Sequence, residues 1–357
     1  MDLPKVSVIV PGLNASSTLG ACLSSLRGQD WPGNLYELIY VDDDSSDRSP
    51  EIAGAFVDRL VRLTGPARGP AGARNMGVES SSGEILVFID ADVVAPAHTI
   101  SSLLKPLVED SGLSAVFGSY DREPAQQTFV SLYRNLFHHY IHQISSAEAS
   151  TFWAGCGAVR RISFEKVGGF DADRYQSPMI EDIELGHRMR AAGMRIRLER
   201  TIQVKHLKKW HVFDIIRADI FHRGIPWMEL LLNERGRSGE IGDLNLKHAA
   251  ALSIPLVWTA LALILFSYRF FALLPVSLLL LGICVLINFP TYAFFFRVRG
   301  LRFALMTIPM QLLYHGCNGV SVLGGLLSHV MMRNRPSKRK ASARYDGDKV
   351  GRGPHSE

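Results

Sequence analysis

The stretch EILVFIDADV, residues 84–93, shows where this chain places charge at the end of a buried strand. Residues 85–89 are apolar and favour extended structure. Two carboxylates, Asp90 and Asp92, then follow with one small residue between them. A strand that is buried on both faces is apolar along its length, and charge is tolerated where such a strand ends at a ligand site. The pattern therefore predicts a core strand that runs into a ligand-binding edge.

Short β-rich segments alternate with helical patterns on either side of this strand. KVSVIVP is followed by a helical pattern at residues 16–28, ELIYVDDDSSD by another at residues 48–58, and DRLVRL comes next. This order predicts an α/β domain with a mostly parallel, doubly wound sheet. Ligands bind outside the carboxyl ends of the strands in such sheets. Pro11, the acidic run at 42–44 and the Asp90–Asp92 pair are therefore expected along one edge.

The two carboxylates after the strand repel each other unless a cation lies between them. Mg²⁺ and Mn²⁺ prefer oxygen ligands and commonly share their coordination with substrate phosphates. Asp90 and Asp92 are therefore expected to bind a divalent metal, Mg²⁺ or Mn²⁺. A lone D-x-D motif more often marks a surface turn, but the Gly-rich stretch GPARGPAGARNMG before this strand favours the metal site.

The absence of two common nucleotide-binding motifs narrows the class of ligand. No G-x-G-x-x-G follows the first strand and no G-x-x-x-x-G-K-[ST] occurs in the sequence, which disfavours a dinucleotide-dependent dehydrogenase and a P-loop NTPase. The acidic end of the second strand has two interpretations. Either Asp42 or Asp43 accepts a hydrogen bond from a nucleotide base or a sugar hydroxyl, or DDDSSD is a solvated turn and helix cap.

Six sequence blocks occur in order between residues 5 and 200. They are VSVIVPGLN, YVDDDSSD, GPARGPAGARNMG, VFIDADV, GCGAVRRISFEKVGGFD and IEDIELGHRMRAAGMRI. The set resembles the family 2 glycosyltransferases of the GT-A fold. The resemblance implies a Rossmann-like catalytic domain that transfers a sugar from a nucleotide-sugar donor.

The resemblance also implies a donor-binding set. The family's Asp-Asp pair, which recognises the nucleotide base, matches Asp42 and Asp43. Its Arg-Asn pair, on the nucleotide side of the site, matches Arg74 and Asn75. Pro11, at the end of the first strand, joins this expected set.

Metal and catalytic roles follow from two further family motifs. The D-x-D motif matches Asp90 and Asp92, which hold the metal on the donor diphosphate, so Asp90 also belongs to the donor site. The Glu-Asp motif matches Glu181 and Asp182, with Asp182 as the catalytic base of a single inverting displacement. Without the other blocks, these two acids would be interpreted as charges favoured by a helix N-terminus. His206 is a candidate third metal ligand, although a structural or lipid-phosphate-facing histidine is the stronger interpretation.

The sequence departs from the family pattern in two places. Asp44 stands where the family usually has glycine. An aspartate at this position affects the conformation of the turn and the choice of nucleotide base. A UDP-sugar is the favoured donor. Processive members carry a Q-x-x-R-W motif, whereas this chain has HRGIPW at residues 222–227, with Arg223 and Trp227 not adjacent. The sequence therefore predicts a non-processive enzyme, with a processive polysaccharide synthase as the alternative.

Hydrophobic residues are unevenly distributed. They make up 47% of the 357 residues, the mean hydropathy is +0.10, and three runs free of Lys, Arg, Asp and Glu lie at residues 249–268, 270–296 and 303–332. A helix of about 20 apolar residues spans a bilayer. Residues 249–332 are therefore expected to form a transmembrane region rather than buried soluble helices. The third run is Gly-rich and polar, and it is expected not to cross fully.

Basic residues indicate the orientation. Arg297, Arg299 and Arg302 lie between the second and third runs, and residues 333–357 contain eight basic against three acidic residues. Such segments stay on the cytoplasmic side, and the start of the chain carries no signal-peptide pattern. The catalytic domain and a disordered tail are therefore expected in the cytosol.

The distribution of charge and the cysteine pattern argue against a nucleic-acid-binding, zinc-binding or disulfide-rich protein. The basic excess behind the pI of 9.0 is concentrated in the tail, which favours contact with membrane lipids over binding of nucleic acid. The four cysteines are scattered without a C-x-x-C motif, so neither a zinc site nor a disulfide framework is expected.

These observations predict four regions. Residues 1–205 are the GT-A nucleotide-sugar-binding domain, 206–248 an amphipathic interfacial linker, 249–332 the transmembrane region and 333–357 the basic cytoplasmic tail. The predicted protein is a membrane-anchored, multi-pass glycosyltransferase acting on a hydroxyl or phosphate of a lipid-linked or glycan acceptor. A catalytically inactive sugar-nucleotide-binding membrane subunit is the alternative, and the complete set of acidic motif residues argues against it.

Overall fold

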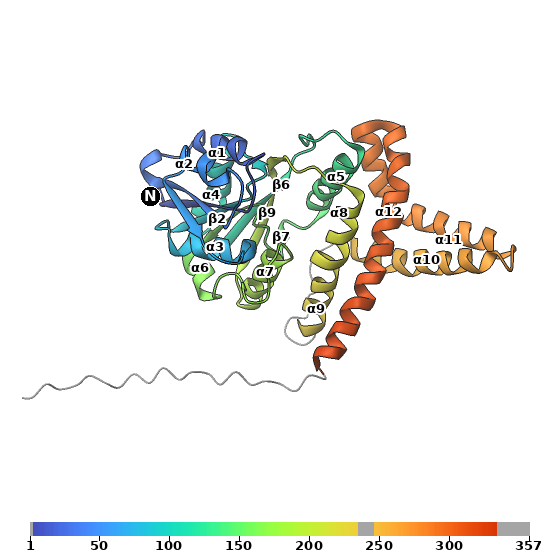
Figure 1. The fold of residues 1–357 in the computed structure, drawn as a ribbon. Helices are drawn as coiled ribbons and strands as arrows, with labels where there is room; N and C mark the ends of the chain where they lie inside the picture. Colours follow the sequence, from blue (N-terminus) through green and yellow to red (C-terminus); the bar gives the residue numbers. More distant parts are fainter. Residues whose placement is uncertain (1–2, 235–245, 334–357) are drawn as a thin grey trace, which may run out of the picture.

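The computed structural model describes residues 3–234 and 246–333. Figure 1 shows an α/β domain that contains the N-terminal part of the chain, a group of helices beside it, and a helical hairpin that extends away from both. Two predicted features, the basic tail after residue 333 and the section 235–245 of the linker, lie outside the described residues.

A single mixed sheet organises the α/β domain. Its strands, among the described residues, are β1 (Val6–Gly12), β2 (Tyr36–Asp43), β3 (Arg59–Leu63), β4 (Ile85–Ile89), β5 (Val93–Val94), β6 (Leu113–Tyr120), β7 (Glu148–Ala149), β8 (Cys156–Arg160) and β9 (Arg195–His206). Their order across the sheet is β3-β2-β1-β4-β8-β6-β9-β5, with β7 paired to β9.

The first half of the sheet has the predicted strand–helix–strand order. β1 pairs in parallel with β2 and β4, and β2 pairs in parallel with β3. The helices of this domain are α1 (Leu19–Arg27), α2 (Ser49–Gly54), α3 (Gly69–Glu79), α4 (Thr99–Glu109), α5 (Phe129–Ile144), α6 (Arg161–Lys166) and α7 (Glu181–Ala191), with a 3-10 turn η1 (Gly33–Leu35). β4 is buried at every position, as expected for a strand covered on both faces. The α/β prediction is confirmed.

The second half of the sheet corrects the expectation of a mostly parallel sheet. β8 pairs antiparallel with β4 and β6, whereas β6 and β9 are parallel. β5 and β7 both pair antiparallel with β9. An antiparallel strand can be joined to its neighbour without a crossover helix. Here the chain passes from β6 to β8 through α5 and the short strand β7. The repeating pattern of the first strands does not predict this change.

The strands fill two hydrophobic cores, one on each face of the sheet. Val8 and Val10 of β1 belong to the core that α1 and α4 cover. Ile9 of β1 and Phe88 of β4 belong to the core that α3, α6 and α7 cover. Because successive strand residues point to opposite faces, a continuously apolar strand anchors itself in both cores. The carboxyl ends of β1 and β4 are thereby held in place.

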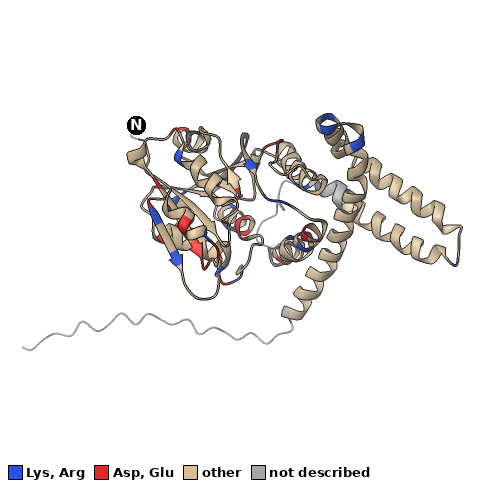
Figure 2. Cartoon of the chain, turned by 45° about the horizontal axis from the view of Figure 1, so that its top comes forward, with Lys and Arg blue, Asp and Glu red and all other residues tan. Residues whose placement is uncertain are grey.

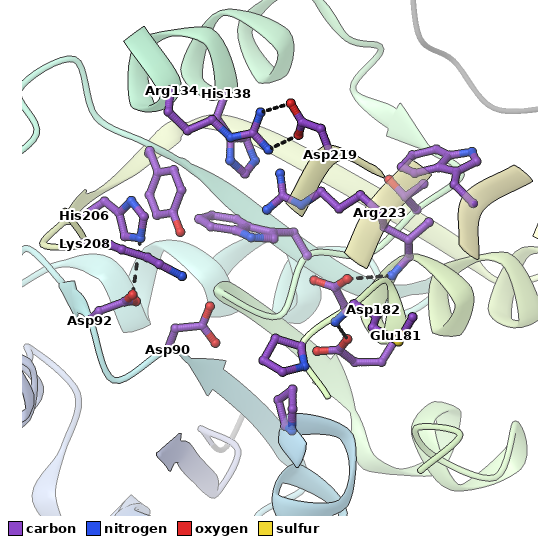
Figure 3. Close-up of a pocket in the computed structure, with 18 of the residues that line it drawn as sticks. Asp90, Asp92, Arg134, His138, Glu181, Asp182, His206, Lys208, Asp219 and Arg223 are labelled. Atoms are coloured by element: carbon purple, nitrogen blue, oxygen red, sulfur yellow. Dashed lines mark hydrogen bonds and ion pairs between the residues drawn. The ribbon is translucent and has the colours of Figure 1, made fainter. Parts of the chain in front are cut away.

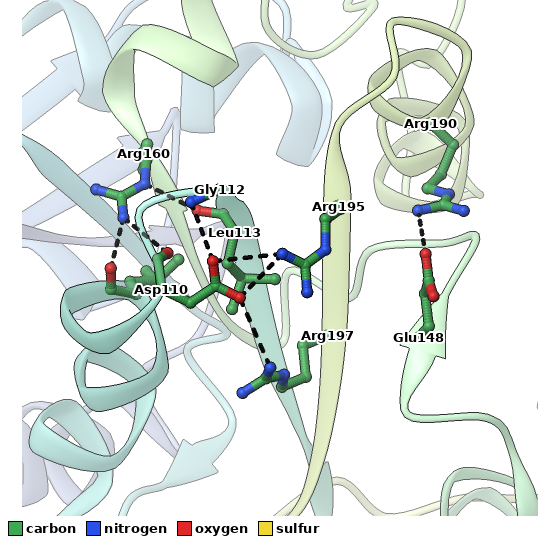
Figure 4. Close-up of polar contacts among 9 residues, drawn as sticks. Asp110, Gly112, Leu113, Glu148, Arg160, Arg190, Arg195 and Arg197 are labelled. Carbon is green, nitrogen blue, oxygen red and sulfur yellow. Dashed lines mark hydrogen bonds and ion pairs between the residues drawn. The ribbon is translucent and has the colours of Figure 1, made fainter.

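Ion pairs lie at the edge where β6 and β9 begin (Figure 4). Asp110 accepts a hydrogen bond from Arg195 at 3.0 Å and lies 3.9 Å from Arg197. Arg160 donates to the carbonyl of Leu113 at 2.8 Å. Ion pairs that are partly exposed contribute only about 0–1 kcal/mol each, so the two cores, rather than these contacts, hold the sheet together.

The remaining helices connect the α/β domain to the helical hairpin. They are α8 (Val212–Arg217), the π-helical turn η2 (Ala218–Gly224), α9 (Ile225–Glu234), α10 (Leu246–Ser267), α11 (Leu273–Ile287) and α12 (Phe289–Arg333). α10 and α11 pack against each other, and α12 contacts η2, α9, α10 and α5. The described part of the predicted linker therefore lies between the α/β domain and α12.

The three charge-free runs form α10, α11 and α12, with different boundaries from those predicted. α12 continues from the second run through the arginine-rich loop into the third, with a break at Gly300, where φ is 81°. Among the described residues no single helix is long and apolar enough to cross a bilayer, but α11 and Phe289–Met331, bent by 65°, pass that test together. Figure 2 shows α10 and α11 almost without charged residues. The multi-pass arrangement stays a prediction.

Candidate active site

The carboxyl ends of β1, β2 and β4 meet beside a cavity of about 1350 Å³. The sequence-predicted residues that line it are Pro11, Asp43, Arg74, Asp90, Asp92, Asp182 and His206. Figure 3 shows Asp90 and Asp92 on one side of this cavity and Asp182 on another. Asp42 and Asn75 are not part of the lining. The structure thus brings together residues that are up to about half the chain apart.

The acidic end of β2 holds the start of α3. Asp43 accepts hydrogen bonds from the backbone N–H groups of Arg68 at 2.9 Å and Gly69 at 2.8 Å, where the helix dipole favours a carboxylate. Asp42 is fully buried, and its Oδ1 has no hydrogen-bond partner among the described residues. Asp44 has a φ of 67°, a left-handed conformation that glycine adopts freely and aspartate tolerates. Asp44 therefore adopts the left-handed turn conformation that the glycine usual in the family would also adopt.

Two neighbouring residues of α3 have different partners. Arg74, which is buried, donates from Nη1 to Glu181 Oε1 at 2.9 Å and from Nη2 to Asp90 Oδ1 at 2.8 Å. Asn75 donates from Nδ2 to the carbonyl of Phe170 at 2.8 Å and accepts from the N–H of the same residue at 3.0 Å. Arg74 therefore links the two acidic motifs, whereas Asn75 fixes a backbone segment.

Asp90 and Asp92 lie in different electrostatic surroundings. Burial raises the pKa of Asp90 despite the ion pair with Arg74. Its Oδ2 accepts no hydrogen bond from any residue within the described ranges, and Figure 3 shows the carboxylate directed toward the cavity. Burial by itself would raise the pKa of Asp92, but its hydrogen bond with His206 and the charge of that residue lower it overall.

His206 is held rigidly beside Asp92. Its Nε2 lies 3.4 Å from Asp92 Oδ2, and its Nδ1 is 3.0 Å from Asn135 Oδ1. The imidazole stacks on Tyr120, with ring centroids 4.2 Å apart. The antiparallel pairing of Val93 with His206 places the histidine there. His206 therefore supports Asp92 in this structure.

The acidic pair fits a divalent cation that is shared with a substrate. No group of three or more His, Cys, Asp or Glu side chains within residues 3–234 and 246–333 is arranged to hold a metal by itself. Asp90 and Asp92 do supply carboxylate oxygens at the cavity wall. Mg²⁺ usually takes one or two carboxylates and completes its shell with phosphate and water. The donor set therefore suits a cation bound together with a diphosphate.

Asp182 faces the same cavity from the first turn of α7. Its Oδ2 accepts from the N–H of Ala154 at 3.0 Å, and its Oδ1 from the N–H of Ile183 at 2.8 Å. Burial, together with the neighbouring carboxylate of Glu181, raises the pKa of Asp182 to about 7. A carboxyl group that titrates near neutral pH can accept a proton in the physiological range, which suits a general base.

The structure adds charged residues that sequence analysis did not place in the site. Arg134 of α5 donates to both oxygens of Asp219, at 2.7 and 3.2 Å, in a buried pair between residues 85 positions apart. Lys208 and Arg223 also line the cavity. Such distant pairs leave no local pattern in the sequence. In the sequence, this region was represented only by the segment HRGIPW and the predicted amphipathic linker at residues 206–248.

Comparison with known proteins agrees with this geometry. Residues 7–168 match the family model described as Glycosyl transferase family 2. The matched residues run from β1 to α6. The chain is 26% identical over 209 residues to the probable glycosyltransferase YdaM of Bacillus subtilis, covering 55% of this chain and 49% of that protein.

A second relative is the UDP-Glc:alpha-D-GlcNAc-diphosphoundecaprenol beta-1,3-glucosyltransferase WfgD of Escherichia coli. It is 32% identical over 123 residues, which are 34% of this chain and 47% of that protein. The chain thus spans about half the length of these curated relatives.

The fold is shared with a solved glycosyltransferase. The mannosyltransferase PcManGT of Pyrobaculum calidifontis, in complex with GDP-Man and Mn²⁺, has a TM-score of 0.54 and 20% identity, covering 92% of this chain and 88% of that one. The likeness supports the GT-A fold expected from the sequence, including helices beyond the sheet domain.

Proposed function

We propose that the chain is a membrane-anchored, metal-dependent, inverting glycosyltransferase. It would move a sugar from a nucleotide-sugar donor to a lipid-linked or glycan acceptor. The observation that carries this proposal is the position of Asp182, with a pKa of about 7, in the same cavity as Asp90 and Asp92. A metal site alone would suit a binding protein, whereas a base beside it suits a transfer reaction.

In this proposal the donor diphosphate lies against Asp90 and Asp92, which hold the metal. The metal, when bound, neutralises charge on the leaving diphosphate as a Lewis acid. Arg74 keeps Asp90 in place through its 2.8 Å hydrogen bond. Lys208 adds positive charge on the side of Asp92. These contacts would orient the sugar toward Asp182.

Asp182 then accepts the proton of the acceptor hydroxyl. The acceptor oxygen attacks the anomeric carbon, the bond to the donor phosphate breaks, and its electron pair leaves with the nucleoside diphosphate. One displacement inverts the anomeric centre. The N–H groups of Ala154 and Ile183 fix the orientation of the base. An acceptor phosphate is already ionised and needs no base, so the raised pKa of Asp182 favours a hydroxyl acceptor.

The donor nucleotide is the least constrained part of the proposal. The sequence favours a UDP-sugar, and the Escherichia coli relative is named for UDP-Glc. The structure with the shared fold contains GDP-Man. The end of β2 remains the proposed place of base recognition, where Asp43 lines the cavity and Asp42 is fully buried behind it.

Membrane attachment and a lipid-linked acceptor rest on two further observations. α11 and Phe289–Met331 together have the length and composition of a bent span. The Escherichia coli relative is named for an acceptor on diphosphoundecaprenol. Because Arg223 and Trp227 are not adjacent in the sequence, we propose that the enzyme adds one or a few sugars rather than a polymer.

Release of nucleotide from a panel of UDP- and GDP-sugars tests the proposed function. The full chain, purified in lipid nanodiscs, should release nucleotide in the presence of Mg²⁺ or Mn²⁺ and lose this activity with excess EDTA. Asp182→Asn should abolish most of the turnover. Absence of metal-dependent release with every donor would overturn the proposal in favour of an inactive binding subunit.

A further inference from the structure

The cavity extends well beyond the proposed donor site. Besides the strand ends, its wall includes residues of α5, η2, α9, α10 and α12. Its volume of about 1350 Å³ exceeds the roughly 300–1,000 Å³ that is usual for a small-molecule site. The space beside Asp182 therefore has room for a second substrate.

Arg223 of η2 is a cation that forms no ion pair with the described residues around this space. Figure 3 shows its side chain directed into the cavity between Asp219 and Asp182. Both oxygens of Asp219 are taken by Arg134, and no ion pair between residues of the described ranges involves Arg223. Burial and the charge of Arg134 lower the pKa of Arg223, although the charges of Asp219 and Asp182 act in the opposite direction. A buried charge is costly unless it is paired, so this guanidinium marks a place for an anion.

Arg223 forms no ion pair with Asp182 in the described part of the chain, although the two charges attract each other. The oxygens of Asp182 accept hydrogen bonds from the backbone N–H groups of Ala154 and Ile183. Lys208, in contrast, lies beside Asp92 in Figure 3. The two cations therefore serve different places, Lys208 at the proposed metal–diphosphate end and Arg223 at the end where the acceptor attacks.

The wall that follows Arg223 along α9 and α10 is apolar, with Trp227, Met228 and Ile254. From α12, Val322 lines the cavity beside Tyr314, Asn318 and Ser321. A hydrocarbon chain covers such a wall with favourable free energy for each methylene buried, whereas a sugar would leave its hydroxyl groups without partners there. This part of the cavity therefore suits the apolar part of an amphiphile.

Close helix packing preforms the apolar wall. A Cβ atom on Gly224 would overlap Ser321 of α12, and one on Gly319 of α12 would overlap Trp258 of α10. The indole Nε1 of Trp258 also donates to the carbonyl of Gly316 at 3.2 Å. Because small residues let helix backbones approach closely, η2, α10 and α12 hold the wall in one arrangement.

We propose that Arg223 and this apolar wall bind an acceptor built as a phosphate ester on a long hydrocarbon chain. The phosphate lies against Arg223, the chain follows α9 toward α12, and a hydroxyl on the other side of the phosphate reaches Asp182. The inference rests on the proposed function, because it assigns the acceptor of that reaction. Leu323, the next residue of α12, lies outside the cavity lining and is 58% exposed.

Binding of decyl phosphate to the full chain in phosphatidylcholine nanodiscs tests this inference by calorimetry. The wild-type protein should bind decyl phosphate in a saturable manner, and decanol should not compete. Arg223→Gln should weaken the binding of decyl phosphate by about tenfold or more, which is the loss expected for one charged hydrogen bond. Arg223→Lys should retain part of the affinity. Neither variant should change the affinity for UDP or GDP in the presence of Mn²⁺.

Two tryptophan variants test the apolar wall with a matched control. Val322→Trp should fill the space beside the apolar wall and weaken the binding of decyl phosphate by about tenfold. The binding of propyl phosphate should not be weakened. Leu323→Trp makes the same kind of change on the exposed face of the same helix and should leave decyl phosphate binding unchanged. Equal losses in both variants would overturn the inference, as would the absence of saturable binding. A loss of nucleotide affinity in Arg223→Gln, with decyl phosphate binding intact, would assign Arg223 to the donor and also overturn it.

The inference and the proposed function fail separately. Metal-dependent sugar transfer to a soluble acceptor, with no binding of decyl phosphate, overturns the inference and leaves the proposed function in place. Binding of decyl phosphate that depends on Arg223 and Val322, without nucleotide release from any donor, supports the lipid-phosphate site and overturns the proposed function.

Discussion

Replacement of Asp182 by asparagine should separate catalysis from stability. Asparagine keeps the size of the side chain but cannot accept the proton of an acceptor hydroxyl. General-base assistance is worth about 10²–10⁴ in rate, which is about 3–5 kcal/mol in activation free energy. Turnover should therefore fall by roughly that factor, while the affinity for the donor changes little.

The raised pKa of Asp182 also predicts a pH-dependent cost in stability. Its pKa is about 7 in the folded protein, against 3.8 for an ordinary aspartate. Between these values the folded state holds a proton that the unfolded chain releases, so the free energy of unfolding should fall as pH rises from about 4 to about 7. At 1.36 kcal/mol per pKa unit the full cost is at most about 4 kcal/mol.

Asp182→Asn removes this cost but introduces a smaller one. The N–H groups of Ala154 and Ile183 both donate to the carboxylate, and an asparagine presents its own NH₂ group to one of them. An unsatisfied buried donor costs about 1–3 kcal/mol. Above pH 7 the variant should therefore be more stable than the wild type by roughly 2 kcal/mol.

The assay compares thermal unfolding and turnover of both proteins at pH 5 and pH 8. The wild type should lose stability on going to pH 8 and should lose kcat/KM below about pH 7, whereas the variant should show neither dependence. Asp173→Asn, an exposed aspartate outside the cavity, is the matched control and should behave as the wild type. A variant with full turnover, or with the wild-type pH dependence of stability, would refute the assignment of Asp182 as the base.

Three further outcomes test other parts of the proposed function. Asp92→Asn should weaken metal-dependent donor binding by about 10–100-fold or more, since even contacts behind a metal ligand are worth that much; isothermal titration with and without EDTA measures it, and full activity in EDTA would contradict it. Washing membranes with alkaline carbonate should leave the chain in the pellet, because α11 and Phe289–Met331 together can span a bilayer; its appearance in the supernatant would count against anchoring. Product analysis under single-encounter conditions should show one or a few added sugars, and a high-molecular-weight ladder would favour the processive alternative.

The local chemistry of the chain determined most of the donor side of the site. Continuous β-branched and aliphatic residues in β1 and β4 specify buried parallel strands. The acids directly after such strands must emerge at the carboxyl edge, so Asp43, Asp90 and Asp92 were predicted beside one cavity and are found there. Asn75 lies in the predicted segment, but its amide binds the backbone of Phe170, and only the packed loop decides that orientation.

The tertiary structure alone decided the part of the cavity where we propose that the acceptor binds, and the chemistry of its charged groups. The sequence pattern also did not reveal the antiparallel entry of β8, because antiparallel and parallel strands have similar local preferences. Arg134 and Asp219, 85 residues apart, meet only after α5 and η2 pack together, and Arg223 is left without an ion pair among the residues that the structure describes. Local patterns specify strands, helices and their ends. Burial and neighbouring charges set the pKa of Asp182, and both depend on which distant segments pack together.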